Sequence, residues 1–308
     1  ERDPFKLIEE NGYFFGRGTQ DVKGEISLIT ATFLRLKAEG FVPMRDLIIA
    51  FTGDEETQMD TARELAIKYR ALTDAEFALN GDGGGGSLDS STGKPQYYKV
   101  QGAEKSYASF TLTAHNPGGH SSQPRPDNAI YELADALKAL QGYSFPIMWN
   151  EWTIGGFKAS APVTPGELGE AMAKFAAHPG DAGAAAILAK TPAMIGRTRT
   201  TCVATLLTGG HADNALPQSA TATVNCRIFP GTSVAEVRDS LQQVVGDRIE
   251  VQVLGEPHSS PPSPLRDDVF KAVTKAVRAS HPGVPIVPDM APYATDGSIL
   301  RGAGIPTY

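Results

Sequence analysis

The stretch DLIIAFTGDEE (residues 46–56) passes from a run of apolar residues directly into three consecutive acids. The apolar part, residues 46–51, predicts a short strand buried between helices in a parallel sheet. Glu55 and Glu56 follow it, and carboxylates this close raise each other's pKa unless a cation lies among them. Taken alone, such a cluster is more typical of a solvated turn than of a site. The rest of the chain must therefore decide between the two.

The segments around this stretch predict α/β organisation. Apolar residues recur at intervals of three and four between residues 22 and 40, which predicts a helix that Gly40 closes. Residues 60–71 are again helical in pattern, and residues 76–80 form a second short apolar run. Strands that alternate with helices form α/β sheets, whose ligands bind beyond the carboxyl ends of the strands.

From about residue 105 the pattern changes to antiparallel strands. Alternation predicts a half-buried strand at 107–115, and Asp127 is expected to cap a helix that runs to Leu140. The later elements are expected at 200–207 (strand), 220–229 (strand), 233–245 (helix), 250–254 (strand) and 266–279 (helix). Residues 142–197, rich in Ala, Gly and Pro, read as an insertion with weak helical patterns.

This order predicts that a compact α+β unit interrupts the α/β unit. We expect a catalytic domain in two parts, residues 1–104 and 258–308, with an inserted lid or dimerisation domain at 105–257. A length of 308 residues fits two compact units.

Composition excludes several classes of protein. The net charge is -7, whereas a nucleic-acid binder would present a basic face. No run of eighteen apolar residues is present, so no membrane span is expected. No signal peptide is visible, and the first residues, Glu1-Arg2-Asp3-Pro4, read like the middle of a longer chain, which leaves the localisation open.

The two cysteines, Cys202 and Cys226, lie on two of the predicted strands. They would face each other if these strands were neighbours. Because unpaired cysteine is commonly buried, two free buried thiols are the expectation.

Three acidic positions stand in loops after apolar runs: Asp21 in GRGTQDVKG, the pair Glu55-Glu56, and Asp82 in NGDGGGG. Each one alone is more typical of a cap or a turn. Together at the mouth of a sheet they would need a cation, and oxygen ligands with imidazole suit zinc or a similar divalent ion. The glycine run after Asp82 lacks the ending of a P-loop, and no G-x-S-x-G motif occurs.

These motifs, with GGHSSQPRPDNAI, GGHADNALPQ and VNCRIFPG, occur in the order found in one family. The chain resembles the co-catalytic zinc aminoacylases and carboxypeptidases, which include acetylornithine deacetylase, succinyl-diaminopimelate desuccinylase, carnosinase and glutamate carboxypeptidases. The resemblance covers nearly the whole chain. It implies a zinc-exopeptidase-like fold, with a mostly parallel sheet covered by helices on both faces. It also implies hydrolysis of an amide bond in a dipeptide or an N-acyl amino acid.

The resemblance further implies a role for each acid. Asp21 would bridge two Zn²⁺ ions, with Co²⁺ or Mn²⁺ as alternatives. Glu56 would bind one ion and Asp82 the other, while Glu55 would act as general base. Asp54 has no role in the family and reads as a turn acid.

Three further residues match family positions outside the acidic cluster. His120 would reach the zinc site of a partner subunit in a homodimer formed by the inserted domain, and would polarise the scissile carbonyl. Asn214 and Arg227 would hold the substrate and its carboxylate. From the residues alone, a turn histidine, a turn asparagine and a surface arginine explain the same positions.

The family's two zinc-binding histidines match none of the six histidines in this chain, which are at 115, 120, 178, 211, 258 and 281. Either the natural protein extends at both ends, or the chain holds zinc weakly. Two alternatives therefore stay open. One is a non-catalytic homologue that serves as a binding or scaffold protein, and the other is a single-metal aminopeptidase.

Overall fold

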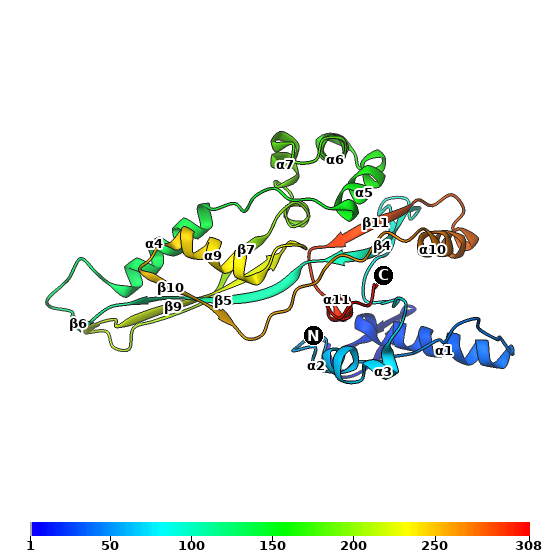
Figure 1. Ribbon diagram of the computed structural model, residues 1–308, viewed down its shortest axis with the longest axis horizontal. Helices are drawn as coiled ribbons and strands as arrows, with labels where there is room; N and C mark the ends of the chain where they lie inside the picture. Colours follow the sequence, from blue (N-terminus) through cyan, green and yellow to red (C-terminus); the bar gives the residue numbers. More distant parts are fainter. Residues whose placement is uncertain (1) are drawn as a thin grey trace.

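The computed structural model describes residues 2–308, which form two main β-sheets flanked by helices (Figure 1). One sheet, with strand order β10-β5-β9-β7, projects away from the rest of the molecule. The other, with order β11-β4-β3, lies beside the segments from both ends of the chain. The two remaining sheets are two-stranded ribbons, β1-β2 and β6-β8. The expected α/β class is confirmed.

The projecting sheet is antiparallel throughout, as the alternating patterns predicted. Its strands are β5 (Ser106–His115), β7 (Thr201–Gly209), β9 (Ser219–Ile228) and β10 (Ile249–Leu254). Two helices, α4 (Ala129–Gly142) and α9 (Val234–Val245), cover one face. Alternate residues of β5 and β9 point to these helices and are buried, for example Phe110 and Val224, whereas Thr111 and Thr223 point to the other face.

The second sheet is mixed, so the expected mostly parallel sheet is wrong. Strand β11 (Ile286–Ala291) pairs with β4 (Pro95–Glu104) in parallel, but β3 (Gly85–Leu88) pairs with β4 antiparallel. Only six residues, 89–94, separate β3 from β4, and a short reversal of this kind can only join antiparallel strands.

Residues 143–197 are helical, as the weak patterns indicated. They contain α5 (Glu151–Ser160), a short turn (Ala161–Val163), α6 (Gly166–Ala177), α7 (Ala182–Leu188) and α8 (Pro192–Ile195). Their own core is built around Phe157, Phe175 and Leu188. Trp152 of α5 is fully buried with Val100 and Met290, so these helices pack against the second sheet.

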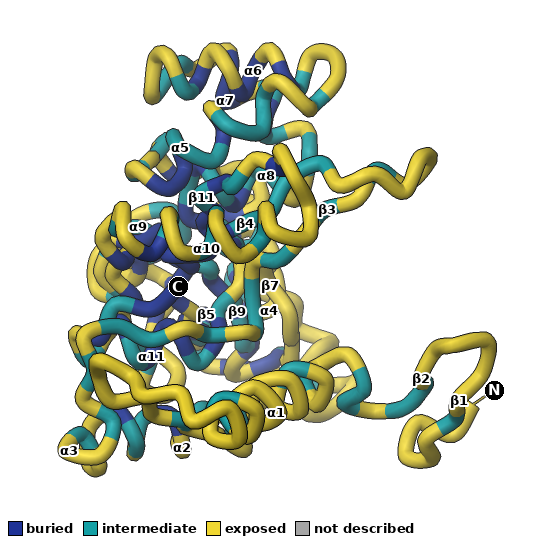
Figure 2. The backbone as a smooth tube through the Cα atoms, turned by 90° about the vertical axis from the view of Figure 1, so that its right-hand side faces the viewer, coloured by how far each residue is buried: buried dark blue, intermediate teal, exposed yellow. Residues whose placement is uncertain are grey.

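Residues 2–75 contain more helix than strand, although a strand was expected among them. They contain β1 (Ile8–Glu10), β2 (Tyr13–Phe15), a turn (Thr19–Lys23), α1 (Gly24–Ala38), α2 (Asp60–Arg63), a turn (Glu64–Lys68) and α3 (Arg70–Thr73). The two expected helices are confirmed in outline, and Gly40 follows α1 with φ +68°. This part of the chain is mostly exposed (Figure 2).

The strand expected at residues 46–51 is wrong. Leu47, Ile48 and Phe51 are 46%, 47% and 51% exposed, and no strand of residues 2–308 pairs with this segment. Without a neighbouring ladder, an apolar run gains neither hydrogen bonds nor a buried face. The run expected at 76–80 makes one parallel bridge, in which Ala78 pairs with Thr307.

Caps decide where the helices of the projecting unit begin. Asn128, not Asp127, caps α4, since its side chain accepts a hydrogen bond from the Ile130 amide. Asp127 instead pairs with Arg125, so the expected cap is one residue too early.

The last helices are α10 (Asp267–Ser280) and α11 (Asp296–Gly302). No helix among residues 2–308 is both long and apolar enough to cross a membrane.

Cys202 and Cys226 form a disulfide, so the expectation of two free thiols is wrong. The register of β7 against β9 places the two residues directly opposite each other, with a Cα–Cα distance of 4.1 Å. The bond ties the edge strand β7 to the centre of the projecting sheet.

We expect loss of this disulfide to destabilise the projecting unit by about 3 kcal/mol, because the bond closes a loop of 24 residues in the unfolded chain. Urea unfolding with and without reductant measures the difference. A Cys202→Ala/Cys226→Ala double variant serves as control, since reductant should leave its midpoint unchanged. Equal midpoints for the oxidised and reduced wild-type protein would contradict the expectation.

Candidate active site

Five acidic side chains from separate segments line one cavity of about 460 Å³. They are Asp21, Glu25, Glu55, Glu56 and Asp82. The four acids selected from the sequence are therefore brought together. Their roles are not visible in the geometry and stay predictions.

The loop that carries Glu55 and Glu56 is held by its neighbour Asp54. The Asp54 carboxylate accepts hydrogen bonds from the amides of Asp60, at 2.7 Å, and Thr61, at 3.1 Å. A further bond from the Thr61 hydroxyl is the main reason why the pKa of Asp54 is lowered. Asp54 is thus the turn acid that the sequence indicated, and it fixes the direction of the two glutamates.

Asp82 reaches the cavity on a loop whose glycines pass close to neighbouring side chains. A Cβ at Gly81 would lie 2.2 Å from Glu25 Oε2, and one at Gly83 would lie 2.6 Å from Gln101 Oε1. Asn80 accepts a hydrogen bond from the Asp82 amide at 3.2 Å. The glycine run therefore allows close approach of the chain to the acids, which is a structural reason for a motif that could be mistaken for a phosphate loop.

The carboxylates perturb one another strongly. Burial, followed by the charges of Asp82, Asp296, Glu56 and Asp21, raises the pKa of Glu55 to about 7. Burial, followed by Asp21, Glu25 and other acids, raises the pKa of Asp82 to about 6. Desolvation and like charge both disfavour the ionised form of these carboxyl groups. A cation bound among them would stabilise that form.

Asp296, at the start of α11, is a member of this group that the sequence reasoning missed. One of its carboxylate oxygens accepts a hydrogen bond from Thr52, and the other, Oδ1, is buried without a hydrogen-bond partner. Burial raises its pKa. The available signal was its position: it follows the apolar strand β11, as Glu55 follows an apolar run. Glu25 was missed for another reason, since it lies inside a helix that was interpreted only as packing.

The donor set fits a hard divalent cation in ligand type and charge, because carboxylate oxygens are the ligands such ions prefer. The buried Oδ1 atom of Asp296 has no hydrogen-bond partner, and the pKa of Glu55 is raised. Both features show that these carboxyl groups lack a positively charged partner. As the side chains are placed, no group of three or more His, Cys, Asp or Glu residues within 2–308 lies in a position to hold a metal ion. Binding would therefore require these side chains to converge further.

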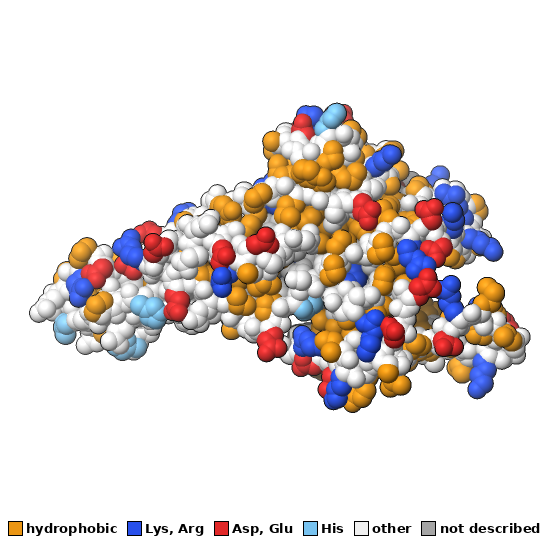
Figure 3. Space-filling model, in the orientation of Figure 1, with side chains coloured by type: hydrophobic (Ala, Val, Ile, Leu, Met, Phe, Trp, Pro, Cys, Tyr) orange, Lys and Arg blue, Asp and Glu red, His pale blue; other side chains and the backbone are white. Residues whose placement is uncertain are grey.

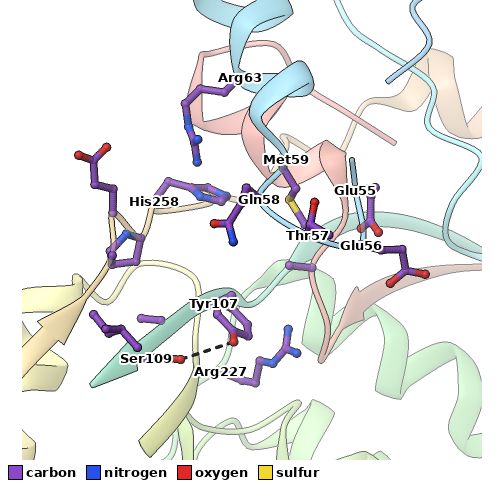
Figure 4. Close-up of a pocket in the computed structure, with 16 residues that line it drawn as sticks. Glu55, Glu56, Thr57, Gln58, Met59, Arg63, Tyr107, Ser109, Arg227 and His258 are labelled. Atoms are coloured by element: carbon purple, nitrogen blue, oxygen red, sulfur yellow. Dashed lines mark hydrogen bonds between the residues drawn. The ribbon is translucent and has the colours of Figure 1, made fainter. Parts of the chain in front are cut away.

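A second cavity, of about 370 Å³, shares Glu55 and Glu56 with the first and opens between the α2 region and the projecting sheet (Figure 4). Arg227 of β9 and Tyr107 of β5 lie on its sheet side. The Arg227 guanidinium stacks over the Tyr107 ring at 4.8 Å from its centroid and makes no ion pair with any residue in 2–308. Of the predicted substrate-binding residues, Arg227 alone lies next to the acids.

Lys105, between β4 and β5, was also missed. It is fully buried and donates a hydrogen bond to Thr201 Oγ1 at 3.1 Å. Burial and then the charge of Arg227 lower its pKa to about 7. Lys105 forms no ion pair within residues 2–308, and its lowered pKa means that it is only partly charged near neutral pH.

His120 and Asn214 lie at the far tip of the projecting sheet, away from the acids of the same chain. His120 belongs to β6 (Gly119–His120), which pairs with β8 (Ala215–Leu216), and the Asn214 carbonyl accepts a hydrogen bond from the Ser121 amide at 3.0 Å. Figure 3 shows histidine side chains at this end of the molecule. Strand β9 runs from this tip, at Ser219, to Arg227, a span of about 25 Å at the usual rise of a strand.

Comparison with known proteins identifies the family of this chain. The model for peptidase family M20/M25/M40 matches residues 1–308. The chain belongs to this family. Its membership supports an enzyme of the metallopeptidase and amidohydrolase type, and nothing in the comparisons supports a non-catalytic homologue.

Curated relatives are similar at low identity. The N-fatty-acyl-amino acid synthase/hydrolase PM20D1 of Xenopus tropicalis is 29% identical over 301 residues, which are 96% of this chain and 58% of the relative. A probable carboxypeptidase S-like 2 of Dictyostelium discoideum is 28% identical over 95% of this chain and 57% of that protein. The chain thus spans less than two thirds of the length of these relatives.

Solved structures support the fold alone, because their identity is low. The dipeptidase Dug1p of Saccharomyces cerevisiae superposes with a TM-score of 0.63 at 13% identity, covering 100% of this chain and 67% of that one. A tripeptidase of Staphylococcus aureus gives 0.62 at 16% identity, covering 98% and 66%.

The raised pKa of Glu55 makes a prediction about stability without metal. Above pH 7 the folded chain must hold an ionised Glu55 that it disfavours, whereas the unfolded chain ionises the residue near pH 4.5. Glu55→Gln should therefore stabilise the chelator-treated protein at pH 8, by about 1–2 kcal/mol once solvent screening is allowed for, and should have no such effect at pH 4.

Urea unfolding at the two pH values measures this difference. Glu170→Gln is the matched control, because Glu170 is exposed on α6 and far from the cavity. The electrostatic account would be refuted if, at pH 8, Glu55→Gln raised the free energy of unfolding no more than Glu170→Gln does.

Proposed function

We propose that the protein is a metal-dependent hydrolase that cleaves the amide bond of a dipeptide or an N-acyl amino acid. The observation that carries the proposal is that the acid-lined cavity opens, through Glu55 and Glu56, into a cavity that holds Arg227. Such a pair of cavities suits a reacting centre beside a site for an anionic end group. Of the relatives above, one is named an N-fatty-acyl-amino acid synthase/hydrolase and another a probable carboxypeptidase, which supports a substrate of this kind.

Asp21, Glu56 and Asp82 are the proposed metal ligands, Asp21 would be shared by two ions, and zinc is the expected metal. Bound divalent ions would polarise the scissile carbonyl and make a water more acidic. The family resemblance also implies histidine ligands, which none of the residues around the cavity supplies. Asp296 is a further oxygen ligand or an acid that orients one.

Glu55 is the proposed general base. It lines the acidic cavity next to the proposed ligand Glu56, where it would take a proton from the attacking water and return it to the leaving amine. Arg227 would bind the carboxylate next to the scissile bond, and its stacking on Tyr107 fixes the guanidinium plane for this contact.

The proposed assembly is a homodimer formed by the projecting sheet and its helices. These elements belong to the inserted domain, which we propose to span residues 105–257. The edge strand β7 has an unpaired side, and Val203, Leu206 and Leu207 are 59%, 66% and 66% exposed. Paired edges would remove an exposed ladder and bury these side chains. In such a dimer, His120 and Asn214 could contact the partner's substrate, which they cannot reach in their own chain.

The first test uses the protein expressed from its complete gene and supplied with Zn²⁺. N-acetyl amino acids and dipeptides should be hydrolysed, whereas their C-terminal amides should not, and a chelator should abolish turnover. Glu55→Gln should lower kcat by about 10²–10⁴-fold while elemental analysis shows unchanged zinc content, because the change removes the base and keeps its shape.

Glu170→Gln again serves as control and should keep full activity. More than about a tenth of the wild-type rate in Glu55→Gln would reject the assigned role. Equal or better cleavage of substrates with a free amino terminus and a blocked carboxylate would favour the single-metal aminopeptidase.

The second test mixes inactive Glu55→Gln chains with inactive His120→Ala chains. If His120 acts across a two-fold interface, a mixed dimer contains one complete site. Random exchange makes about half of the dimers mixed, so activity should return to roughly a quarter of the wild-type level under this two-fold model. No recovery, once mass spectrometry has shown that subunits exchange, would mean that His120 does not act across the dimer.

A further inference from the structure

The cavity that holds Arg227 has another polar corner, which the proposed function does not use. Arg63, at the end of α2, and His258, in the segment after β10, enter it from the side opposite Tyr107 and Arg227 (Figure 4). Glu55 and Glu56 form the third corner. A substrate that fills the cavity therefore meets three different groups of side chains.

The Arg63 guanidinium has hydrogen-bonding capacity left for a ligand. Its one acidic partner among residues 2–308 is Asp60, at 2.6 Å, whose side chain is 66% exposed. A pair in contact with water contributes little and neutralises the arginine only in part. Arginine carries five N–H donors, and the bond to Asp60 uses a single Nη1 atom.

His258 is held in a fixed orientation beside this arginine. Its Nε2 atom lies 2.9 Å from the Ser298 hydroxyl, and Ser298 is fully buried in α11. Burial, and then the charge of Arg63, lowers the pKa of His258. In the tautomer whose Nε2 accepts a hydrogen bond from the Ser298 hydroxyl, Nδ1 carries the proton and can donate a hydrogen bond to an anion beside Arg63.

The walls of the cavity also argue against a long alkyl group. Ten of its lining residues are polar or charged, and they include Thr57, Gln58 and Ser109. An alkyl chain packed against Arg63 and His258 would remove water from both without replacing its hydrogen bonds, which costs free energy. Glu256 lies in the same wall but makes no ion pair with Arg63.

We propose that Arg63 and His258 bind a second carboxylate of the substrate, carried either by the acyl group or by the side chain of the amino acid. This inference rests on the proposed function, since it places the first carboxylate at Arg227 and the scissile amide at Glu55. The substrate would then be a small diacid. The N-fatty-acyl amino acids for which the PM20D1 relatives are named would be poor ligands for this cavity.

Two matched pairs of substrates test the proposal and separate the two sources of the carboxylate. N-succinyl-glycine is compared with N-butyryl-glycine, and N-acetyl-glutamate with N-acetyl-norvaline. Within each pair one terminal carboxylate replaces a methyl group. The diacid of at least one pair should have a KM on the order of tenfold lower, as expected for a hydrogen-bonded charged pair.

Arg63→Gln should remove this preference by raising KM for the diacid on the order of tenfold, while kcat and the KM of the uncharged partner change less than about threefold. Arg63→Lys, which keeps the charge but loses the fork, should retain part of the preference. Lys68→Gln is the matched control, because Lys68 is an exposed cation five residues further along that does not line this cavity, and it should behave like the wild-type protein.

Calorimetric binding of the same four compounds to the zinc-loaded Glu55→Gln protein gives a readout without turnover. No preference for a diacid in either pair, or a preference that survives in Arg63→Gln, would overturn the inference. If the wild-type protein hydrolyses none of the compounds but binds a diacid more tightly through Arg63, the proposed function fails while the recognition site stands. If it hydrolyses them all without preference, only the recognition site fails.

Discussion

The arrangement of the site follows from one electrostatic constraint, the repulsion among carboxylates that share a partly buried cavity. Burial and neighbouring acids act in the same direction on Glu55 and Asp82, and raise both pKa values well above those of the free side chains. The fold meets this cost with local devices. The Asp54 carboxylate is stabilised by hydrogen bonds from backbone amides, and two glycines let the Asp82 loop come close to the other acids. A structure that accepts such repulsion without cationic side chains is organised for a cation from outside.

Positive charge is present near the site, but it is kept on the other side of the reacting centre. Arg227 lies on the projecting sheet, Lys105 lies between β4 and β5, and Arg63 lies at the end of α2. None of them forms an ion pair with the acids of the first cavity. Separation of this kind leaves the acids available to metal and the cations available to an anionic substrate. Ion pairs between these cations and the acids would stabilise the folded chain but would leave neither group free to bind a ligand.

The sequence predicted those parts of the fold in which one buried face enforces a pattern. Strand β5 was found because apolar and polar residues alternate along it, and in the structure the expected helix α9 begins at a capping box of Ser233 and Glu236. The segment at 46–51 was misjudged because an apolar run indicates burial but not a partner strand. Cys202 and Cys226 were misjudged because strand register is a tertiary property, and register alone places them opposite each other.

The same distinction holds within the site. Asp21, Glu55, Glu56 and Asp82 could be selected from motifs, because each stands in a loop with a recognisable composition. Asp296 and His258 stand in no such motif, and their importance depends on what lies across the cavity from them. Chemistry that resides in a local turn is visible in sequence, whereas chemistry made by two distant segments meeting is not.

Both connections between the two parts of the molecule are tied together by buried polar groups. Glu104 pairs with Arg301 of α11, Arg301 donates to Ser260 Oγ, and the Ser260 amide donates to Ser106 Oγ. Glu104 ends β4 and Ser106 begins β5 of the projecting sheet, while Ser260 lies on the chain that returns from that sheet. Since α11 also carries Asp296, one buried network connects the base of the projecting sheet to the acidic cavity.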